Sequence, residues 1–179
     1  MSSLKLTLKS WPLIALLTIG LCYLTQLVAK GFGIELPDQA NIEIVKRYAG
    51  WNWNFAFLCF QVLVLMPTVE ELGFRYLLWR LPTRTLDFRR KTGDEEGQKT
   101  EDGRRIGAAG VVAAVSSVLF SAAHYIAQPW PDAAFIALFF FGLAQCWLYK
   151  KTGHLWCAIL NHGLFNLTNL VLLFVLPEA

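Results

Sequence analysis

Long uninterrupted apolar blocks constrain this chain more than any other feature of its sequence. Five blocks lie near or above the ~20 residues that a helix needs to cross about 30 Å of hydrocarbon, at residues 11–29, 52–78, 107–127, 133–149 and 153–176. Only 16% of the 179 residues are charged, whereas an ordinary soluble domain has about a quarter. Backbone groups in a membrane must be satisfied internally, so segments of this kind are helical. The sequence therefore predicts an all-α, polytopic transmembrane helical bundle of about five spans.

The distribution of Lys and Arg between these spans predicts the orientation of the bundle. Basic residues gather before the first span (Lys5 and Lys9), in the segment 80–105, and at the turn 150–151. With five spans, these three places lie on one side of the membrane. Because cytoplasmic loops are enriched in basic residues, we expect the N-terminus inside and the C-terminus outside. Block 11–29 is followed by no small-residue cleavage site, so we interpret it as a retained span rather than a signal peptide.

The chain divides into two regions on this reading. Residues 1–50 are predicted to hold the first span and an external loop, and residues 51–179 a helical core. Within the core, residues 80–105 are predicted to form a charged cytoplasmic loop, because their centre has no apolar periodicity.

The net charge of +3 is small and the basic residues are scattered, which argues against a nucleic-acid partner. The expected surroundings are the lipid bilayer.

The second span contains charged residues that membrane helices rarely tolerate. An ionisable residue at a helix centre costs roughly 2.5–3.5 kcal/mol on insertion scales, so such residues usually face the bundle interior and serve a function. Glu71 and Arg75 stand at positions i and i+4, in the order that favours a structural ion pair. Glu70 points about 100° away from Glu71 and has Phe74 where a partner would stand. A carboxylate left unpaired in this way suits a general base.

Two neighbouring residues bear on this interpretation. Pro67 cannot donate to the carbonyl of Leu63, so we expect the helix to kink there. Arg80 follows within ten residues of Glu70, and the charges could instead simply mark the cytoplasmic end of the helix.

Two later spans contribute histidines. His124 closes the motif FSAAH at 120–124, whose small residues permit close helix approach; taken alone, it could be an interface residue. His162 and Asn166 stand at positions i and i+4 and project from one face of the last span. They fit either a ligand pair or an interhelical hydrogen-bond pair. Together with Glu70, they give three apolar helices the base and the donors that peptide hydrolysis needs to activate water and hold an oxyanion.

In these motifs the sequence resembles the CAAX-processing and bacteriocin-processing family of intramembrane proteases, also called CPBP or Abi. The family pattern EExxxR, FxxxH and HxxxN reads here as EELGFR at 70–75, FSAAH at 120–124 and HGLFN at 162–166. Order and spacing match across roughly residues 65–172, so residues 51–179 would form the catalytic core. The chain departs from the pattern in having one span before the core and a longer, more charged segment at 80–105. Both departures bear on how a substrate reaches the site.

The resemblance implies a role for each motif residue. Glu70 would activate water with His124, and His162 and Asn166 would form the oxyanion side, while the neighbouring Glu–Arg pair would be structural. No metal cofactor is expected, although a Glu and two His could bind zinc, in which case the ligands would be Glu70, His124 and His162. The implied activity is that of a glutamate-type intramembrane endopeptidase acting on a membrane-proximal segment of a protein or peptide.

Two other classes of protein remain open at this point. A non-enzymatic bacteriocin-immunity or membrane scaffold protein of the same fold would keep its phenotype after Glu70→Ala. A small proton- or metal-coupled transporter would move ions across vesicles, but the sequence shows no inverted repeat or pair of broken helices of the transporter kind.

The positions of the polar residues along their helices set a geometric requirement. At ~1.5 Å per residue, Glu70 lies about 15 Å from the basic end of its span, and His162 lies about as far from its own. His124 lies about 29 Å from Arg105 on the same count. For the three to meet, the third helix must begin before the membrane, tilt, or be re-entrant.

Overall fold

The computed structural model describes residues 2–36, 40–50, 52–84, 98–126 and 133–175. All regular structure among these residues is helical, which confirms the all-α prediction. Two segments, η1 and η2, are π-helical, and η4 is a 3-10 turn. In chain order the elements are α1 (Ser3–Gly31), α2 (Ala40–Tyr48), α3 (Trp53–Phe60), η1 (Gln61–Leu65), α4 (Met66–Glu70), η2 (Glu71–Arg80), α6 (Gln98–Ala123), η4 (His124–Ile126), α7 (Ala134–Thr152) and α8 (Leu155–Val175).

Four helical stretches of the described chain are long and apolar enough to cross a membrane. They are Ser3–Gly31, Trp53–Arg84, Ala108–Ile126 and Leu155–Val175, and they coincide with the first, second, third and fifth predicted spans. The fourth predicted span is α7, a helix of 19 residues that ends in two lysines. Helix α6 begins at Gln98, ahead of the third predicted span at residues 107–127.

Helix extends further than the sequence predicts at both ends of the segment 80–105. The second span continues to Arg84, and α6 starts at Gln98, so residues 85–97, which lie outside the described residues, are what remains of the predicted loop. The predicted external loop likewise contains α2. Missing apolar periodicity does not prevent helix formation, because Glu, Lys, Arg and Gln are themselves good helix formers.

The distribution of side chains is the reverse of that in a soluble protein. Large apolar residues such as Leu16 and Leu27 are 69% and 68% exposed, whereas Glu71 and Arg75 are 0% exposed. Water would favour the opposite arrangement, but hydrocarbon solvates the apolar surface at no cost and forces polar groups inward. The chain is therefore an integral membrane protein.

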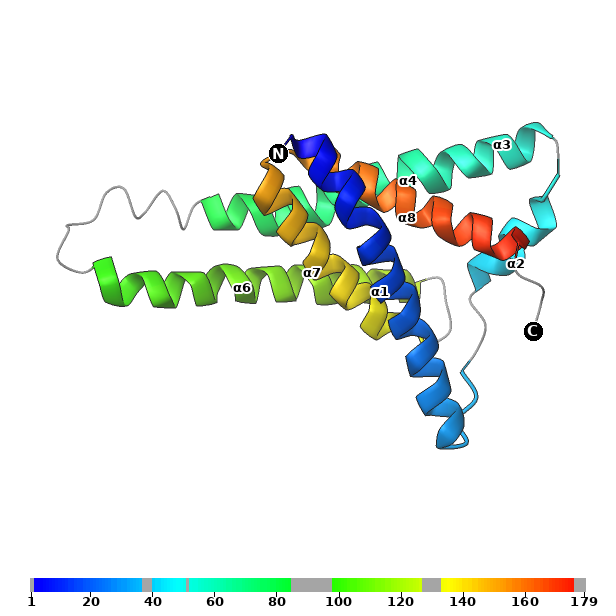
Figure 1. Ribbon diagram of the computed structural model, residues 1–179, viewed down its shortest axis with the longest axis horizontal. Coiled ribbons are helices and arrows are strands. Elements are labelled where there is room, and N and C mark those ends of the chain that lie inside the picture. Colours follow the sequence, from blue (N-terminus) through cyan, green and yellow to red (C-terminus); the bar gives the residue numbers. More distant parts are fainter. Residues whose placement is uncertain (1, 37–39, 51, 85–97, 127–132, 176–179) are drawn as a thin grey trace.

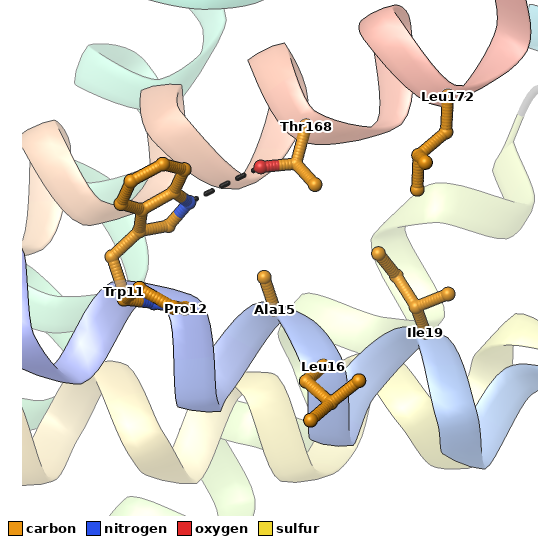
Figure 2. A pocket seen from close by; sticks show the side chains of 7 residues that line it. All are labelled: Trp11, Pro12, Ala15, Leu16, Ile19, Thr168 and Leu172. Carbon is orange, nitrogen blue, oxygen red and sulfur yellow. Dashed lines mark hydrogen bonds between the residues drawn. The ribbon is translucent and has the colours of Figure 1, made fainter. Parts of the chain in front are cut away.

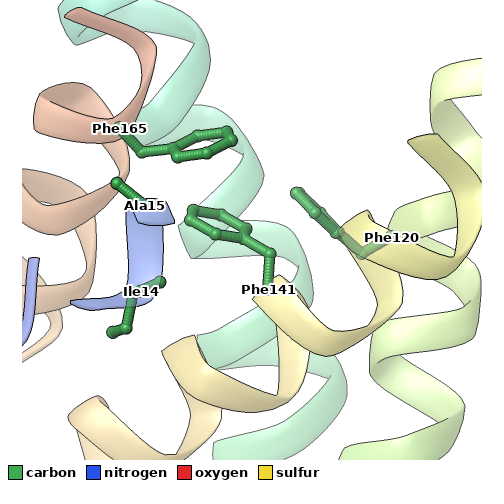
Figure 3. Close-up of a cluster of buried hydrophobic side chains, with 5 residues drawn as sticks. All are labelled: Ile14, Ala15, Phe120, Phe141 and Phe165. Carbon is green, nitrogen blue, oxygen red and sulfur yellow. The ribbon is translucent and has the colours of Figure 1, made fainter. Parts of the chain in front are cut away.

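Helix α7 lies at the centre of the packing and contacts α1, α6 and α8. In Figure 1, α1 crosses obliquely in front of α7 and α8. Figure 3 shows Phe141 of α7 lying between Phe120 of α6 and Phe165 of α8, with Ile14 and Ala15 of α1 completing the cluster. The rings of Phe141 and Phe165 are 4.6 Å apart and those of Phe120 and Phe141 are 6.1 Å apart. This aromatic stack joins α6 and α8, which carry the predicted histidines, to α7 and α1.

A cavity of about 300 Å³ separates α1 from α8 on one side of this cluster (Figure 2). Its lining is almost wholly apolar, and it includes Ala15, Ile19 and Leu172. One polar contact closes one end, where Trp11 Nε1 donates to Thr168 Oγ1 at 3.2 Å. Helix α1 therefore docks on α8 through a hydrogen bond beside an incompletely filled apolar gap.

Close backbone approach fixes α6 against α7. A Cβ atom added at Gly142 would lie 2.8 Å from both Cβ and Oγ of Ser117, closer than real side chains come. Only glycine fits at this position, as at other small-residue crossings of membrane helices.

We expect Gly142→Ala to lower the thermal unfolding midpoint of the protein in lipid nanodiscs. The added methyl group overlaps Ser117, and overpacking of this kind costs roughly 1–3 kcal/mol. Gly20→Ala is the matched control, because a Cβ there meets nothing within 4 Å and alanine is the better helix former. A midpoint for Gly142→Ala equal to that of the control would contradict the close crossing of α6 and α7.

Candidate active site

A local break in backbone hydrogen bonding precedes the two adjacent glutamates of the second span. In η1, the amide of Met66 donates to the carbonyl of Gln61 rather than to that of Val62. In this π-helical register the donor for Val62 would be Pro67, which has no N–H. Asn166 of α8 supplies the missing donor, since its Nδ2 bonds to the Val62 carbonyl at 2.8 Å. Pro67 therefore leaves the Val62 carbonyl without a donor from its own helix, and Asn166 of α8 supplies one.

The same crossing requires glycine on α8. A Cβ atom at Gly163 would lie 2.5 Å from the carbonyl oxygen of Leu63, so the two helices meet backbone to backbone. Gly163 directly follows His162 in the sequence. This contact and the Asn166 hydrogen bond together hold the histidine-bearing helix against the glutamate-bearing one.

Glu71 is the centre of the polar cluster. Its side chain is fully buried, and its Oε1 accepts a hydrogen bond from His162 Nδ1 at 2.9 Å. Its Oε2 lies 3.2 Å from Arg75 Nε, so the structure places the two residues of the predicted ion pair in contact. Because an ionised carboxylate can only accept, the proton of a neutral His162 ring is on Nδ1. The lone pair of Nε2 then points away from Glu71.

Arg75 is held by charge and by an aromatic face. Its guanidinium carbon lies 4.2 Å from the centre of the Phe120 ring, in a cation–π arrangement. Its three nitrogens are buried and, like Glu71 Oε2, make no hydrogen bond within the described part of the chain, so the contact with Glu71 is an ion pair by distance alone. The charge of Arg75 therefore depends on Glu71 and Phe120 for compensation.

Glu70 has a different environment from its neighbour. Its side chain is 20% exposed, and its Oε2 lies 3.6 Å from His162 Nε2, just beyond hydrogen-bond distance. His162 therefore lies between the two carboxylates, with one ring nitrogen toward each. The resemblance pairs Glu70 with His124, but the contact that the structure shows is with His162.

His124 stands at the end of α6, where the helix tightens into η4. Its Nδ1 lies 2.9 Å from the carbonyl oxygen of Phe120 and must be the donor, because a carbonyl only accepts. The ring of Phe120 packs against both imidazoles, with centroid distances of 4.8 Å to His124 and 5.9 Å to His162. The Phe of the FxxxH motif is thus a shared packing partner of both histidines and of Arg75, a role that the motif alone does not reveal.

The conditional zinc ligands are not grouped in the structure. Among the residues that the structure describes, no three His, Cys, Asp or Glu side chains lie close enough together to hold a metal ion. Nδ1 of His162 bonds to the Glu71 carboxylate and Nδ1 of His124 to the Phe120 carbonyl, an arrangement that metal-binding histidines also show. The expectation that no metal cofactor is needed stays a prediction.

A buried amide pair lies next to the cluster. Gln145 Nε2 of α7 donates to Asn161 Oδ1 at 3.0 Å, and both side chains are 0% exposed. Asn169, further along α8, differs from Asn161 in that its Nδ2 bonds to the Phe165 carbonyl of its own helix. Gln145 carries a signal that could have been read, because it is the one amide in the apolar run of its span, where polar groups are costly.

The fold and the site together define a polytopic helical membrane protein with a buried carboxylate–imidazole–guanidinium cluster and one accessible glutamate beside it. The chain belongs to the Rce1-like family: the family model described as type II CAAX prenyl endopeptidase Rce1-like matches residues 52–168, more than half of the chain. This confirms the resemblance and makes the protein a member of an intramembrane CAAX protease family. Helix α1 lies outside the matched range. No curated protein and no solved structure matches the chain.

A double-mutant cycle on Asn166 and Pro67 tests whether Asn166 compensates the Val62 carbonyl for the N–H that Pro67 lacks. Asn166→Ala leaves the Val62 carbonyl buried without a donor, which should lower the free energy of unfolding by about 1–3 kcal/mol. In a Pro67→Ala background, residue 67 regains an N–H and the penalty of Asn166→Ala should shrink. Denaturation in detergent micelles measures both values; an equal penalty in the two backgrounds would contradict the coupling.

Removing the buried carboxylate should be far more damaging than removing the whole ion pair. Glu71→Leu strands the charge of Arg75, and breaking a buried pair in this way costs about 3–5 kcal/mol. The double variant Glu71→Leu with Arg75→Met replaces both charges by apolar groups and should recover most of the lost thermal stability. If the double variant is as unstable as Glu71→Leu, the hypothesis that Glu71 and Arg75 compensate each other's charge is contradicted.

Proposed function

We propose that the protein hydrolyses a peptide bond in a membrane-proximal segment of a protein or peptide, with Glu70 as the base that activates water. The observation that carries this proposal is the unequal use of two adjacent carboxylates. Glu71 is fully buried and committed to His162 and Arg75, whereas Glu70 is partly exposed and has only a loose contact to His162. The accessible carboxylate is therefore the one able to meet a water molecule and a substrate.

The distances around Glu70 suit a shared water. A water bound to Glu70 Oε2 could also reach His162 Nε2, since the two atoms are 3.6 Å apart. Glu70 would take a proton from the water as its oxygen attacks the carbonyl carbon, and would return a proton to the amine as the C–N bond breaks. His124 is assigned to orienting the same water through Nε2, because its Nδ1 is engaged with the Phe120 carbonyl.

The carbonyl oxygen of the substrate becomes an oxyanion during attack and needs donors. An asparagine side chain has two N–H groups, and Asn166 uses one on the Val62 carbonyl. We assign the second N–H of Asn166 to the oxyanion, together with His162 in its protonated form. Asn166 would then stabilise the crossing of α8 with the second span through one N–H and the substrate oxyanion through the other.

The substrate proposed is a protein tail or peptide at the membrane surface, in keeping with the CAAX prenyl endopeptidase description of the family. We also propose that the N-terminus is cytoplasmic and the C-terminus external, in a bacterial plasma membrane. In Figure 1 the N-terminus, the end of η2 and the turn between α7 and α8 lie toward one side, and the C-terminus toward the other. Basic residues stand at the end of the Trp53–Arg84 run and at the end of α7, and positive charge favours the cytoplasmic face.

Membranes from cells expressing wild type or Glu70→Gln should differ in their peptides. We expect mass spectrometry to find new peptide termini with wild type, and purified wild type in nanodiscs to cleave a farnesylated CAAX peptide. Glu70→Gln should slow that cleavage by ~10²-fold or more, as loss of a general base does, and leave the unfolding midpoint near that of wild type. Glu35→Gln, at an exposed carboxylate of the first loop, is the control.

Other outcomes would point to other classes of protein. Identical peptide profiles from two folded, inserted proteins would favour an immunity or scaffold protein. Ion flux into vesicles that requires Glu70 would favour a transporter.

A further inference from the structure

Helix α7 carries none of the three family motifs, yet it holds a polar contact next to the site. Gln145 is fully buried in this helix, and its Nε2 donates to Asn161 Oδ1 of α8 at 3.0 Å. Asn161 directly precedes His162, the residue whose ring lies between Glu70 and Glu71. The amide pair therefore lies one residue along α8 from His162 of the polar cluster.

Two polar contacts in different directions set the rotation of α8 about its axis. Successive side chains on a helix point about 100° apart, so Asn161 faces α7 while His162 faces the carboxylates of the second span. Apolar packing against α7, such as that of Phe141 on the His162 ring at 5.1 Å, is not directional. A hydrogen bond is directional, and Gln145–Asn161 is thus the contact from α7 that can fix the angle.

The pair is a poor choice for stability alone. Gln145 Oε1 and Asn161 Nδ2 are buried and find no hydrogen-bond partner among the described residues. Buried polar atoms without partners destabilise a fold, and two apolar residues of similar shape would avoid that loss. Proteins tolerate a locally destabilising feature, such as this amide pair, mainly where a functional site has to be held in one geometry.

We propose that Gln145 is a positioning residue, which acts through Asn161 to hold His162 with Nδ1 on Glu71 and Nε2 toward Glu70. The consequence for catalysis rests on the proposed function; the consequence for the ring of His162 does not. The two can therefore be tested separately on the same variants of the full-length protein.

The orientation of His162 can be followed by NMR of ¹³Cε1-labelled histidine in nanodiscs. The chain has three histidines, so each signal can be assigned by substitution. Gln145→Leu should shift or broaden the His162 signal and leave that of His154 unchanged. Asn169→Leu is the matched control on the same helix, because among the described residues the Asn169 amide bonds to the backbone of its own helix, and it should leave the His162 signal in place.

Cleavage of the farnesylated CAAX peptide gives the second readout. Gln145→Leu should lower kcat by between about ten- and a hundredfold, the range for misplacement of a reacting group, with KM within about twofold because the residue does not contact substrate. Exchanging the two amides, Gln145→Asn with Asn161→Gln, restores a hydrogen bond between the same helices. This exchange should return kcat and the His162 signal toward wild type, which loss of general stability would not explain.

The outcomes separate the two hypotheses. If wild type cleaves nothing but Gln145→Leu displaces the His162 signal, the proposed function fails and the positioning role stands. If the His162 signal is the same in wild type and Gln145→Leu, the positioning role is overturned, whatever the cleavage rates. Should Gln145→Leu not fold, the amide exchange decides instead: a wild-type His162 signal supports the role, and a displaced one overturns it.

Discussion

The burial of the Glu71 carboxylate is the constraint on which the rest of the structure depends. A fully desolvated carboxylate is strongly unfavourable unless its charge and its acceptor atoms are engaged. One oxygen meets His162 of α8, and the other meets Arg75 of its own helix. Arg75 in turn needs the face of Phe120 on α6. One buried charge therefore ties three membrane helices together, whereas the adjacent Glu70 stays partly exposed.

The backbone of the second span imposes a comparable demand. Pro67 removes an amide hydrogen at the point where the helix is already π-helical, and the Val62 carbonyl is then satisfied by Asn166. Breaks of this kind are tolerated in membrane helices when a neighbouring helix supplies the missing group. Gly163 permits the close approach that this requires. Asn166, which we propose as an oxyanion donor, is thus also needed to complete the hydrogen bonding of the helix that carries Glu70, the proposed base.

The sequence predicts the helices well and their mutual rotation poorly. Apolar length locates the spans, and the i,i+4 spacing places Glu71 and Arg75 together in the structure. Periodicity does not predict the helix that enters the segment 80–105 from both ends, up to Arg84 and from Gln98 onward. It also does not show that Glu70 lies against His162, or that Gln145 reaches Asn161. These contacts join different helices. They depend on how each helix is rotated about its axis, and the pattern of residues within one helix does not determine that rotation.

The physical reason is that lipid and protein core are both apolar. A soluble helix shows by its apolar stripe which face is buried, but a membrane helix gains little hydrophobic free energy from facing its neighbours rather than lipid. Orientation must therefore come from directional polar contacts and from glycines that admit another backbone. Directional contacts of this kind include His162–Glu71, Asn166–Val62, Gln145–Asn161, Trp11–Thr168, Ser116–Phe74 and Ser121–Phe135, and the close crossings are at Gly142 and Gly163. Three of them, made by Asn161, His162 and Asn166, lie at or beside the candidate site, where the same polar side chains also specify how the helices are turned.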